Sequence, residues 1–306
     1  MSSRSLDMRN RDTFSGYHPV INLFYFVLVL AFSMVLMHPV CLCISLTAAL
    51  CCSLTLGGKK SVRGSLLLLL PMALVAAAVN VLFNHEGATI LAYLPSGNPL
   101  TLESIIYGFS AAVMLSALVL WFLCFSQVMT SDKLVYLFGR IIPALSLVIS
   151  MTLRFVPKFK AQFKVVADAQ KCAGRPIDEG KTLQRIKHAV TVFSIMVTWS
   201  LENGIETADS MKSRGYGLPG RSAFSIYTFD KRDKKALLWL TFCAVTMIYG
   251  TASGKFTWQF YPVMRGMPLN GFVLVLYLVD LALGMTPVFL HWQEERNWKK
   301  LQEAEA

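Results

Sequence analysis

Residues 102–128 read LESIIYGFSAAVMLSALVLWFLCFSQV, an apolar run in which Glu103 is the only charged residue. A helix needs about 20 apolar residues to cross the hydrocarbon core of a bilayer. The run is long enough for this, so it predicts a transmembrane helix. A chain built around such a run is governed by the membrane, where helices satisfy their own backbone hydrogen bonds.

Other parts of the chain have the same character. Hydrophobic residues make up 55% of the 306 residues, above the roughly 45–50% of ordinary soluble domains. His38-Pro39 separates the first two runs, since proline interrupts helical hydrogen bonding. We therefore predict an all-α, polytopic membrane helical protein with about six spans and long cytoplasmic amphipathic coupling helices. The five further predicted spans cover residues 20–37, 40–56, 65–83, 236–250 and 271–290.

Lysine and arginine gather in alternate connections between these runs. The amino-terminal tail, 1–18, and the connection 57–63 are basic, whereas the connections 38–39 and 84–100 contain neither lysine nor arginine. Cytoplasmic loops carry the excess of cations in multi-pass proteins. We therefore expect a multi-pass protein of the inner (cytoplasmic) cell membrane with its amino terminus in the cytoplasm.

The middle of the chain, 131–235, contains two shorter apolar stretches, 141–155 and 189–199. If both crossed the membrane, eight lysines and arginines would lie outside against three acidic residues. That arrangement violates the bias of cations toward the cytoplasm. We therefore place this region in the cytoplasm, with apolar helix faces against the membrane interface. The predicted organisation is a cytoplasmic tail (1–18), a four-helix transmembrane region (19–130), a coupling-helix domain (131–235), two carboxy-terminal transmembrane helices (236–291) and a cytoplasmic tail (292–306).

Two long helices are predicted within this domain, over 143–173 and 182–214. Both end in a glycine next to an arginine, at Gly174-Arg175 and Arg214-Gly215. Glycine caps a helix by taking the left-handed conformation cheaply, and a nearby cation offsets the helix dipole. The pattern therefore fits a simple cap. It also fits two converging arginine-tipped ends that couple to an acidic groove, because a guanidinium offers a fixed fork of donors to carboxylates.

Three stretches resemble the transmembrane (T) component of energy-coupling-factor importers of vitamins and metals. They are Tyr17-His18-Pro19 before the first membrane helix, Ala169-Gln-Lys-Cys-Ala173-Gly174, and Ser213-Arg214-Gly215. In the first helix-end motif the arginine is missing from its usual place, and Arg175 follows the glycine instead. The resemblance implies that the ATPase-coupling residues are Ala173, Gly174, Arg175, Ser213, Arg214 and Gly215.

The resemblance also implies a non-catalytic scaffold. Two cytoplasmic ABC ATPase subunits would bind the ends of the coupling helices and move them. The scaffold would pass this motion to a membrane-embedded substrate-binding (S) protein. The apolar positions Phe155, Phe159, Phe163 and Val166 would then line the S protein, or else pack within the chain.

Several other functions lack the residues they need. The chain has no Gly-x-x-x-x-Gly-Lys-Ser/Thr phosphate loop, so ATP hydrolysis is assigned to partner subunits and no cofactor is predicted. Its histidines and cysteines are scattered, so no metal site is predicted. Basic and aromatic residues do not interleave as in a nucleic-acid groove, so no nucleic-acid partner is predicted.

Two rival readings and two local questions stay open at this point. One rival is an integral-membrane enzyme in which Arg175 and Arg214 grip a phosphorylated lipid, which requires acids or histidines converging nearby. The other is a self-contained secondary transporter. Asp280 lies within the last predicted span, where an acid is a functional candidate. The acidic residues Glu202, Glu206 and Asp209 either pair with Arg214 or form a solvated face. The transported substrate cannot be read from this sequence.

Overall fold

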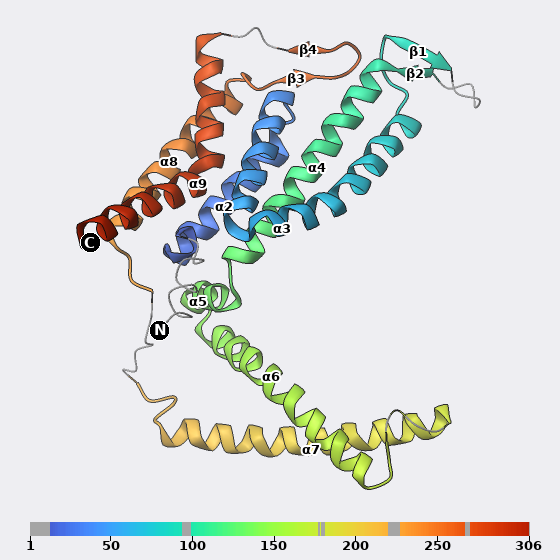
Figure 1. Ribbon diagram of the computed structural model, residues 1–306, viewed down its shortest axis with the longest axis vertical. Helices are drawn as coiled ribbons and strands as arrows, with labels where there is room; N and C mark the ends of the chain where they lie inside the picture. The colour runs from blue at the N-terminus through green and yellow to red at the C-terminus, as the bar shows by residue number, and fades with distance from the viewer. Residues whose placement is uncertain are drawn as a thin grey trace. The chain divides into compact units, whose positions relative to one another are not determined.

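The computed structural model describes residues 13–93, 99–176, 178, 181–219, 227–266 and 270–305. The described chain is mainly helical, with two small antiparallel hairpins (Figure 1). It forms two compact units: Met1–Leu134 with Tyr227–Ala306, and Val135–Ile226. The three arginines of the basic amino-terminal tail, Arg4, Arg9 and Arg11, lie outside the described residues.

The first unit is a bundle of apolar helices. It contains η1 (Phe14–Gly16), α2 (Pro19–Val35), α3 (Pro39–Phe83), α4 (Leu102–Val128), the start of α5 (Ser131–Ile141), α8 (Lys231–Ala252) and α9 (Gly271–Glu305). In the described part of the chain, five segments are long and apolar enough to cross a membrane: Pro39–Gly58, Val62–Phe83, Leu102–Val128, Lys231–Ala252 and Gly271–Asn297. The sixth predicted span, α2, is also apolar and has 17 residues. The prediction of an all-α, polytopic membrane protein is confirmed.

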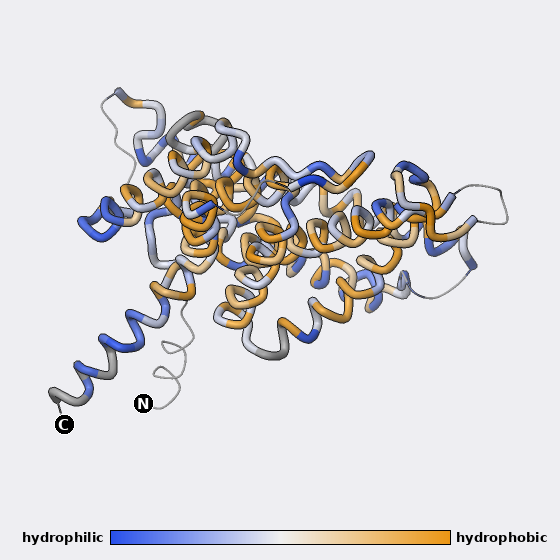
Figure 2. Tube along the Cα trace, turned by 90° about the horizontal axis from the view of Figure 1, so that it is seen from above, coloured by the Kyte–Doolittle hydropathy of each residue, from blue (hydrophilic) through white to orange (hydrophobic). Residues whose placement is uncertain are grey.

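Two of the predicted spans belong to one long element. The runs 40–56 and 65–83 both lie in α3, which is kinked where the backbone of Gly58 leaves the helical conformation. The last span also extends further than predicted, because α9 continues without a break through the expected tail to Glu305. Figure 2 shows the change along α9 from hydrophobic to hydrophilic residues toward the carboxy terminus.

Short hairpins close the connections after α3 and α8. In the first, β1 (Ile90–Tyr93) pairs with β2 (Pro99–Thr101), and in the second, β3 (Trp258–Gln259) pairs with β4 (Arg265–Gly266). Both hairpins lie in connections between predicted spans, and their strands were not predicted from the sequence. The strands are two to four residues long, too short for an alternating pattern to stand out.

A histidine followed by proline begins both α2 and α3. The Nδ1 atoms of His18 and His38 accept hydrogen bonds of 3.3 Å from the backbone N–H groups of Val20 and Val40. Proline suits the first helical position because it has no N–H group to satisfy there. The same local sequence therefore builds the same helix start twice.

The core of the bundle is aromatic. Tyr25, Phe26 and Trp121 are fully buried and lie edge to face with one another. The polar atoms of this core are satisfied, because Trp121 Nε1 donates to Ser45 Oγ (3.0 Å) and the Tyr25 hydroxyl donates to the Gly284 carbonyl (3.0 Å). Aromatic pairs of this geometry add about 0.5–1.5 kcal/mol beyond their area burial.

A set of charged side chains ties the amino-terminal turn to one end of the bundle. Buried Lys133 Nζ donates to the carbonyls of Ser15 (2.6 Å) and Val128 (2.9 Å). Arg232 donates to the Gly16 carbonyl, and Asp233 accepts from the His18 backbone N–H. The start of α2, the end of α4 and the start of α8 therefore lie at the same end, as alternate crossings require.

The second unit contains the rest of α5 and two long helices, α6 (Pro143–Cys172) and α7 (Thr182–Ser213). Both long helices match the ranges predicted from sequence, and α6 continues through Pro157. They cross each other and share a small core of Val166, Val192 and Met196. The ring of Phe159 lies edge to face with Trp199 at 5.4 Å. The predicted location of this unit in the cytoplasm stays a prediction.

Candidate functional site

The end of α7 is a glycine-capped turn that presents Arg214. Gly215 has a φ of +77° and donates its N–H to the Lys212 carbonyl, while Tyr216 donates to the Met211 carbonyl. These two bonds form a Schellman motif, in which a left-handed glycine satisfies carbonyls that the helix leaves free. Arg214 is the C-cap of α7.

The end of α6 has the same backbone arrangement. Gly174 has a φ of +76° and donates to the Lys171 carbonyl, and Arg175 donates to the Gln170 carbonyl. Ala173 is the C-cap. The two predicted motifs are therefore structural equivalents, with Gly174 in the place of Gly215.

The arginines occupy different positions within this shared turn. Arg214 stands one residue before its glycine, where α6 has Ala173. Arg175 stands one residue after its glycine, where α7 has Tyr216. Arg175 is therefore displaced relative to Arg214 in the structure of the turn, as well as in the sequence.

The turn alone does not define a binding site. α8 ends in the same way, with Gly254 at a φ of +67° donating to Thr251 and Lys255 donating to the Gly250 carbonyl. This motif is a common way to end a helix. Any function of these helix ends therefore depends on the side chains that the turns present and on the helices that carry them.

Both arginines of the α6 and α7 ends are exposed. Within the described ranges, neither guanidinium has a salt bridge or a side-chain hydrogen bond. The predicted partners of Arg214, the acidic residues Glu202, Glu206 and Asp209, are exposed and form no ion pair with it. Of the two open readings for these acids, the solvated face is the one observed.

The two ends do not converge, which corrects the expectation of two converging arginine-tipped ends. Phe159 of α6 lies against Trp199 of α7, and Val166 packs with Val192, so the helices cross in opposite directions. The end of α6 therefore lies toward the start of α7, about 40 Å along α7 from its own end at 1.5 Å per residue. Figure 1 shows the two helix ends on opposite sides of the crossing. Each end would serve a separate contact.

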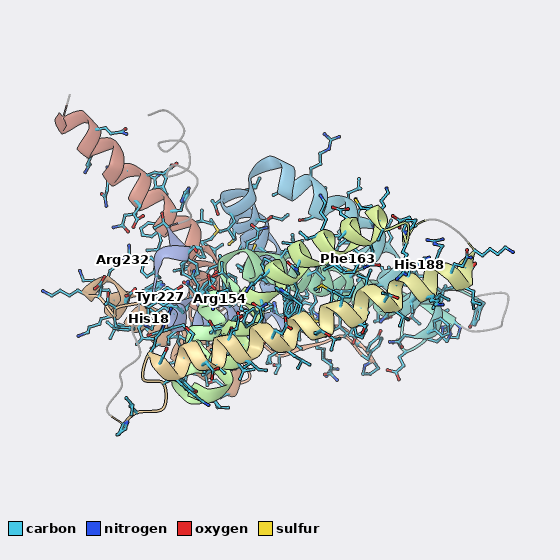
Figure 3. All side chains as sticks on the ribbon, turned by 90° about the horizontal axis from the view of Figure 1, so that it is seen from below. His18, Arg154, Phe163, His188, Tyr227 and Arg232 are labelled. Carbon is cyan, nitrogen blue, oxygen red and sulfur yellow. The ribbon has the colours of Figure 1, made fainter. Side chains whose placement is uncertain are left out.

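The predicted apolar stripe of α6 is divided between two environments. Phe159 and Val166 pack within the crossed pair, whereas Phe163 is 49% exposed. Phe163 lines an open apolar groove with Phe193 and Val197 of α7. Figure 3 labels Phe163 on α6 and His188 near the start of α7.

α7 carries a longer exposed stripe that sequence analysis missed. Its members recur every three or four residues, the spacing of one helix face. They are Leu183, Ile186, Val190, Phe193, Val197 and Leu201, all exposed. Their periodicity is present in the sequence and could have been found there. A stripe of this size on a charged helix is a surface that fits a partner or a membrane.

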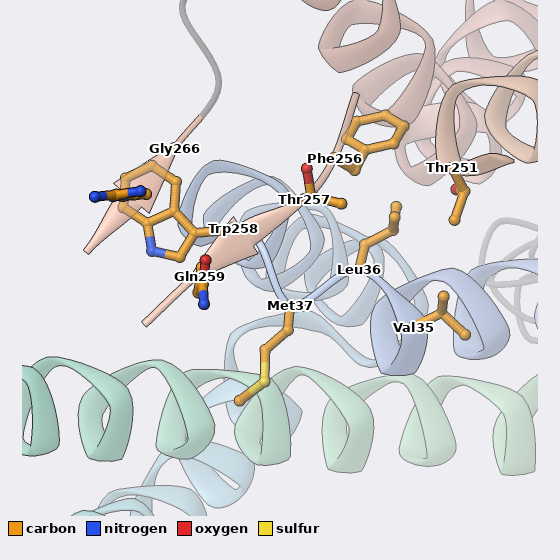
Figure 4. A pocket seen from close by; sticks show the side chains of 10 residues that line it. Val35, Leu36, Met37, Thr251, Phe256, Thr257, Trp258, Gln259 and Gly266 are labelled. Atoms are coloured by element: carbon orange, nitrogen blue, oxygen red, sulfur yellow. The ribbon is translucent and has the colours of Figure 1, made fainter. Parts of the chain in front are cut away.

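Other candidates give no comparable site. Within the described residues, no group of three or more His, Cys, Asp or Glu side chains could hold a metal ion. Asp280 is half-buried in the bundle beside the Cys41 thiol. An open cavity of about 500 Å³ next to the β3–β4 hairpin is lined by Met37, Phe256 and Trp258 among others (Figure 4).

The bundle of apolar helices identifies the chain as a multi-pass membrane protein. The crossed helices α6 and α7 form a second, amphipathic unit of the same chain. The family model described as CbiQ, cobalt transport protein, matches residues 15–226. This is more than half of the chain, which therefore belongs to the CbiQ family of cobalt transport proteins.

Three relatives are energy-coupling factor transporter transmembrane proteins. The chain is 32% identical over 90 residues to EcfT of Lactobacillus helveticus (strain DPC 4571), covering 29% of this chain and 32% of the relative. It is 34% identical over 83 residues to EcfT 1 of Listeria monocytogenes serotype 1/2a (strain 08-5578), covering 27% and 31%. It is 28% identical over 105 residues to EcfT of Lactococcus lactis subsp. cremoris (strain MG1363), covering 34% and 40%.

The chain thus spans between 31% and 40% of the length of these relatives. Their names, together with the family match, confirm the resemblance to the transmembrane component of energy-coupling-factor transporters.

Proposed function

We propose that this chain is the transmembrane scaffold (T) subunit of an energy-coupling-factor, ABC-type importer. The observation that carries the proposal is the crossed pair α6 and α7, whose exposed ends each present an arginine whose guanidinium group has no salt bridge or side-chain hydrogen bond among the described residues. The pair falls within the segment that matches the CbiQ family. The scaffold is non-catalytic, and ATP hydrolysis is done by partner subunits.

Two cytoplasmic ABC ATPase subunits are the proposed partners of the two ends. The separation of the ends supports one subunit at each, with Arg214 and Arg175 donating to carboxylates in acidic grooves. Lys171 and Lys212 in the last helical turns add positive charge at the same places. The residues in these contacts would be Ala173, Gly174 and Arg175 on α6, and Ser213, Arg214 and Gly215 on α7.

A membrane-embedded substrate-binding S protein is the proposed partner of the apolar faces. The exposed stripe of α7, from Leu183 to Leu201, and the groove at Phe163 together offer a continuous apolar surface. Such a surface is favourable only against another apolar surface. Long, stiff helices would then carry a displacement from the ATPase ends to this surface.

The proposed orientation has the amino terminus and the crossed pair in the cytoplasm. Lys133, Arg232 and Lys235 lie at the end of the bundle that holds the amino-terminal turn. The opposite end carries the hairpins, where Lys255 and Arg265 are the cations of the β3–β4 connection. The excess of cations supports the first end as the cytoplasmic one.

Co-purification with the ATPase subunits of the same cells tests this function. We expect tagged wild-type chain to retain a pair of ATPases. Arg214→Ala should lower the retained ATPase by about tenfold or more, because hydrogen bonds to charged groups contribute about 1.5–3 kcal/mol. Loss with Arg175→Ala would assign the first contact to the shifted arginine.

Arg154→Ala is the matched control, since Arg154 is an exposed arginine of α6 that lies about 27 Å along the helix from its end, at 1.5 Å per residue. It should retain the wild-type amount of ATPase. If the wild-type chain retains no ATPase, the scaffold function is wrong. If Arg154→Ala loses as much as Arg214→Ala, the helix ends are not the contact points.

A further inference from the structure

We propose that the groove between α8 and α9 binds one anionic phospholipid at the membrane boundary. This inference goes beyond the scaffold function and does not depend on it. It depends on the membrane bundle alone, in which both helices are candidate spans. The groove has a volume of about 780 Å³, within the roughly 300–1,000 Å³ range of small-molecule sites.

One wall of the groove runs from charge to aromatic surface along a single face of α8. Lys231, Lys235 and Trp239 all line it and stand four residues apart. Residues at this spacing lie one above another on a helix. At 1.5 Å per residue, the first lysine and the indole are about 12 Å apart along the axis. This places the cations at the end of the helix and the indole well inside the span.

The facing wall is supplied by α9 and is apolar at the same depth as the indole. Met285 and Phe289 line it there. The Trp239 indole is held at the groove because Nε1 donates to Thr286 Oγ1 across it at 3.3 Å. Trp239 is 41% exposed and Phe289 is 60% exposed. This depth of the groove therefore offers apolar surface suited to an acyl chain.

The charged end of the groove has an excess of cations. Arg232 pairs with Glu294 at 3.1 Å and lies 4.3 Å over the Tyr17 ring. Lys231 and Lys235 are exposed and form no salt bridge among the described residues. Two positive charges are thus left at the mouth, directly above an apolar wall.

This combination favours a lipid over other occupants. An acidic segment of a protein would match the lysines but not the apolar lower wall. A free phosphate would likewise use only the upper part. A phospholipid with a net negative headgroup matches both parts in the order in which they occur along the span. Lysines near an anionic leaflet contribute to binding in the same way.

Quenching of Trp239 by brominated lipids tests the site in the full chain. The probes are vesicles of phosphatidylcholine containing either brominated phosphatidylglycerol or brominated phosphatidylcholine. We expect stronger quenching by brominated phosphatidylglycerol, and Trp239→Phe should remove the difference. The double variant Lys231→Gln/Lys235→Gln should lower the apparent affinity for phosphatidylglycerol about twenty-fivefold, since each lysine near the surface contributes about fivefold.

Lys234→Gln is the control, because Lys234 is exposed on the same helix turn but does not line the groove. It should keep the wild-type preference. Equal quenching by the two lipids would overturn the proposal and indicate non-selective contact with bulk lipid. Equal loss in Lys234→Gln would overturn it in favour of a diffuse surface attraction. Absence of any quenching at Trp239 would overturn it in favour of a protein occupant.

Discussion

The bundle and the crossed pair are both made of long amphipathic or apolar helices, yet they bury very different surfaces. In the bundle, Tyr25, Phe26 and Trp121 are fully buried. Among the described side chains of α6 and α7, the buried ones are Val166, Val192 and Met196, and most large apolar side chains of α7 are exposed. The bundle therefore has an extensive aromatic core of its own, whereas the pair buries only a small core and leaves most of the apolar face of α7 exposed.

The forces that hold the two regions also differ. Inside a bilayer, helices associate through close packing and hydrogen bonds, because lipid is as apolar as the helices. The bundle has both devices: Gly284 lies against Ala48, and the hydroxyls of Ser33 and Ser45 share a hydrogen bond of 2.6 Å. The pair is held by one aromatic contact, a small aliphatic core and the Lys158 side chain of α6, which donates to Asn203 Oδ1 and lies over the Trp199 ring of α7.

Replacing one tryptophan in each region gives the largest expected contrast. Trp121→Ala should destabilise the bundle by about 3–5 kcal/mol, since it empties a fully buried site. Trp199→Ala should cost about 1–2 kcal/mol, from its contacts with Phe159 and with Lys158 over the indole ring. Thermal unfolding in detergent reports the first change. Protease cleavage mapped within residues 135–226 reports the second. An equal loss of stability in Trp121→Ala and Trp199→Ala would contradict the proposed difference between the bundle and the crossed pair.

Replacing one glycine by alanine in each region should change the free energy of unfolding in opposite directions. A Cβ atom on Gly284 would meet the Ala48 Cβ at 2.7 Å, so α3 and α9 would have to separate. We expect Gly284→Ala to cost about 1–3 kcal/mol, as overpacked sites do. A Cβ atom on Gly204 of α7 would meet nothing within 4 Å. Gly204→Ala should stabilise α7 by roughly 0.5–1 kcal/mol. Thermal unfolding in detergent checks Gly284→Ala, and protease cleavage within residues 135–226 checks Gly204→Ala. A gain in stability in Gly284→Ala would show that α3 and α9 are loosely packed.

The smallest expected effect is a pH dependence of the stability of the bundle, which arises from His38. Burial lowers the pKa of His38 from its ordinary value, and its Nδ1 must be unprotonated to accept from Val40. The unfolded state therefore binds more protons in acid than the folded state does. Stability from this group is complete above the ordinary histidine pKa of about 6.5 and is lost as the pH falls below it.

His38→Asn separates this titration from the cap, because asparagine is a good N-cap that does not titrate. The variant should be less stable than wild type near pH 8, because the His38 ring also contacts Trp258 and the Tyr277 hydroxyl, but its stability should fall less on acidification to pH 5. The measurement is the unfolding temperature across that range. A wild-type chain that becomes more stable in acid would contradict the sign.

The helices were predictable because their signals are local. The run 102–128 coincides with α4, and the predicted coupling helices end within one residue of Cys172 and Ser213. The kinked union of two spans in α3 was not predicted, because a Gly-Gly-Lys-Lys sequence resembles a simple turn. The hairpins β1–β2 and β3–β4 were missed since their strands are too short to establish a period.

The contacts between distant segments could not be predicted. Lys133 reaches Ser15, and Asp233 reaches the N–H of His18, across 118 and 215 residues of sequence. A local signal existed for part of this, because Asp230-x-x-Asp233 has the spacing of a helix cap. The arginines of the two helix ends were found from sequence. Their separation was not, because it depends on where α6 and α7 cross.

The different places of the two arginines around the same turn have a mechanical consequence. A C-cap residue still belongs to the last turn of its helix, so Arg214 is the tip of a rigid lever formed by α7. Arg175 lies beyond the left-handed glycine of α6, in the segment that leaves the helix. A force applied at Arg214 therefore acts along and around the axis of α7. A force applied at Arg175 first extends the chain segment that follows Gly174, before it acts on α6. We expect α7 to transmit push and torque, and α6 to transmit mainly pull.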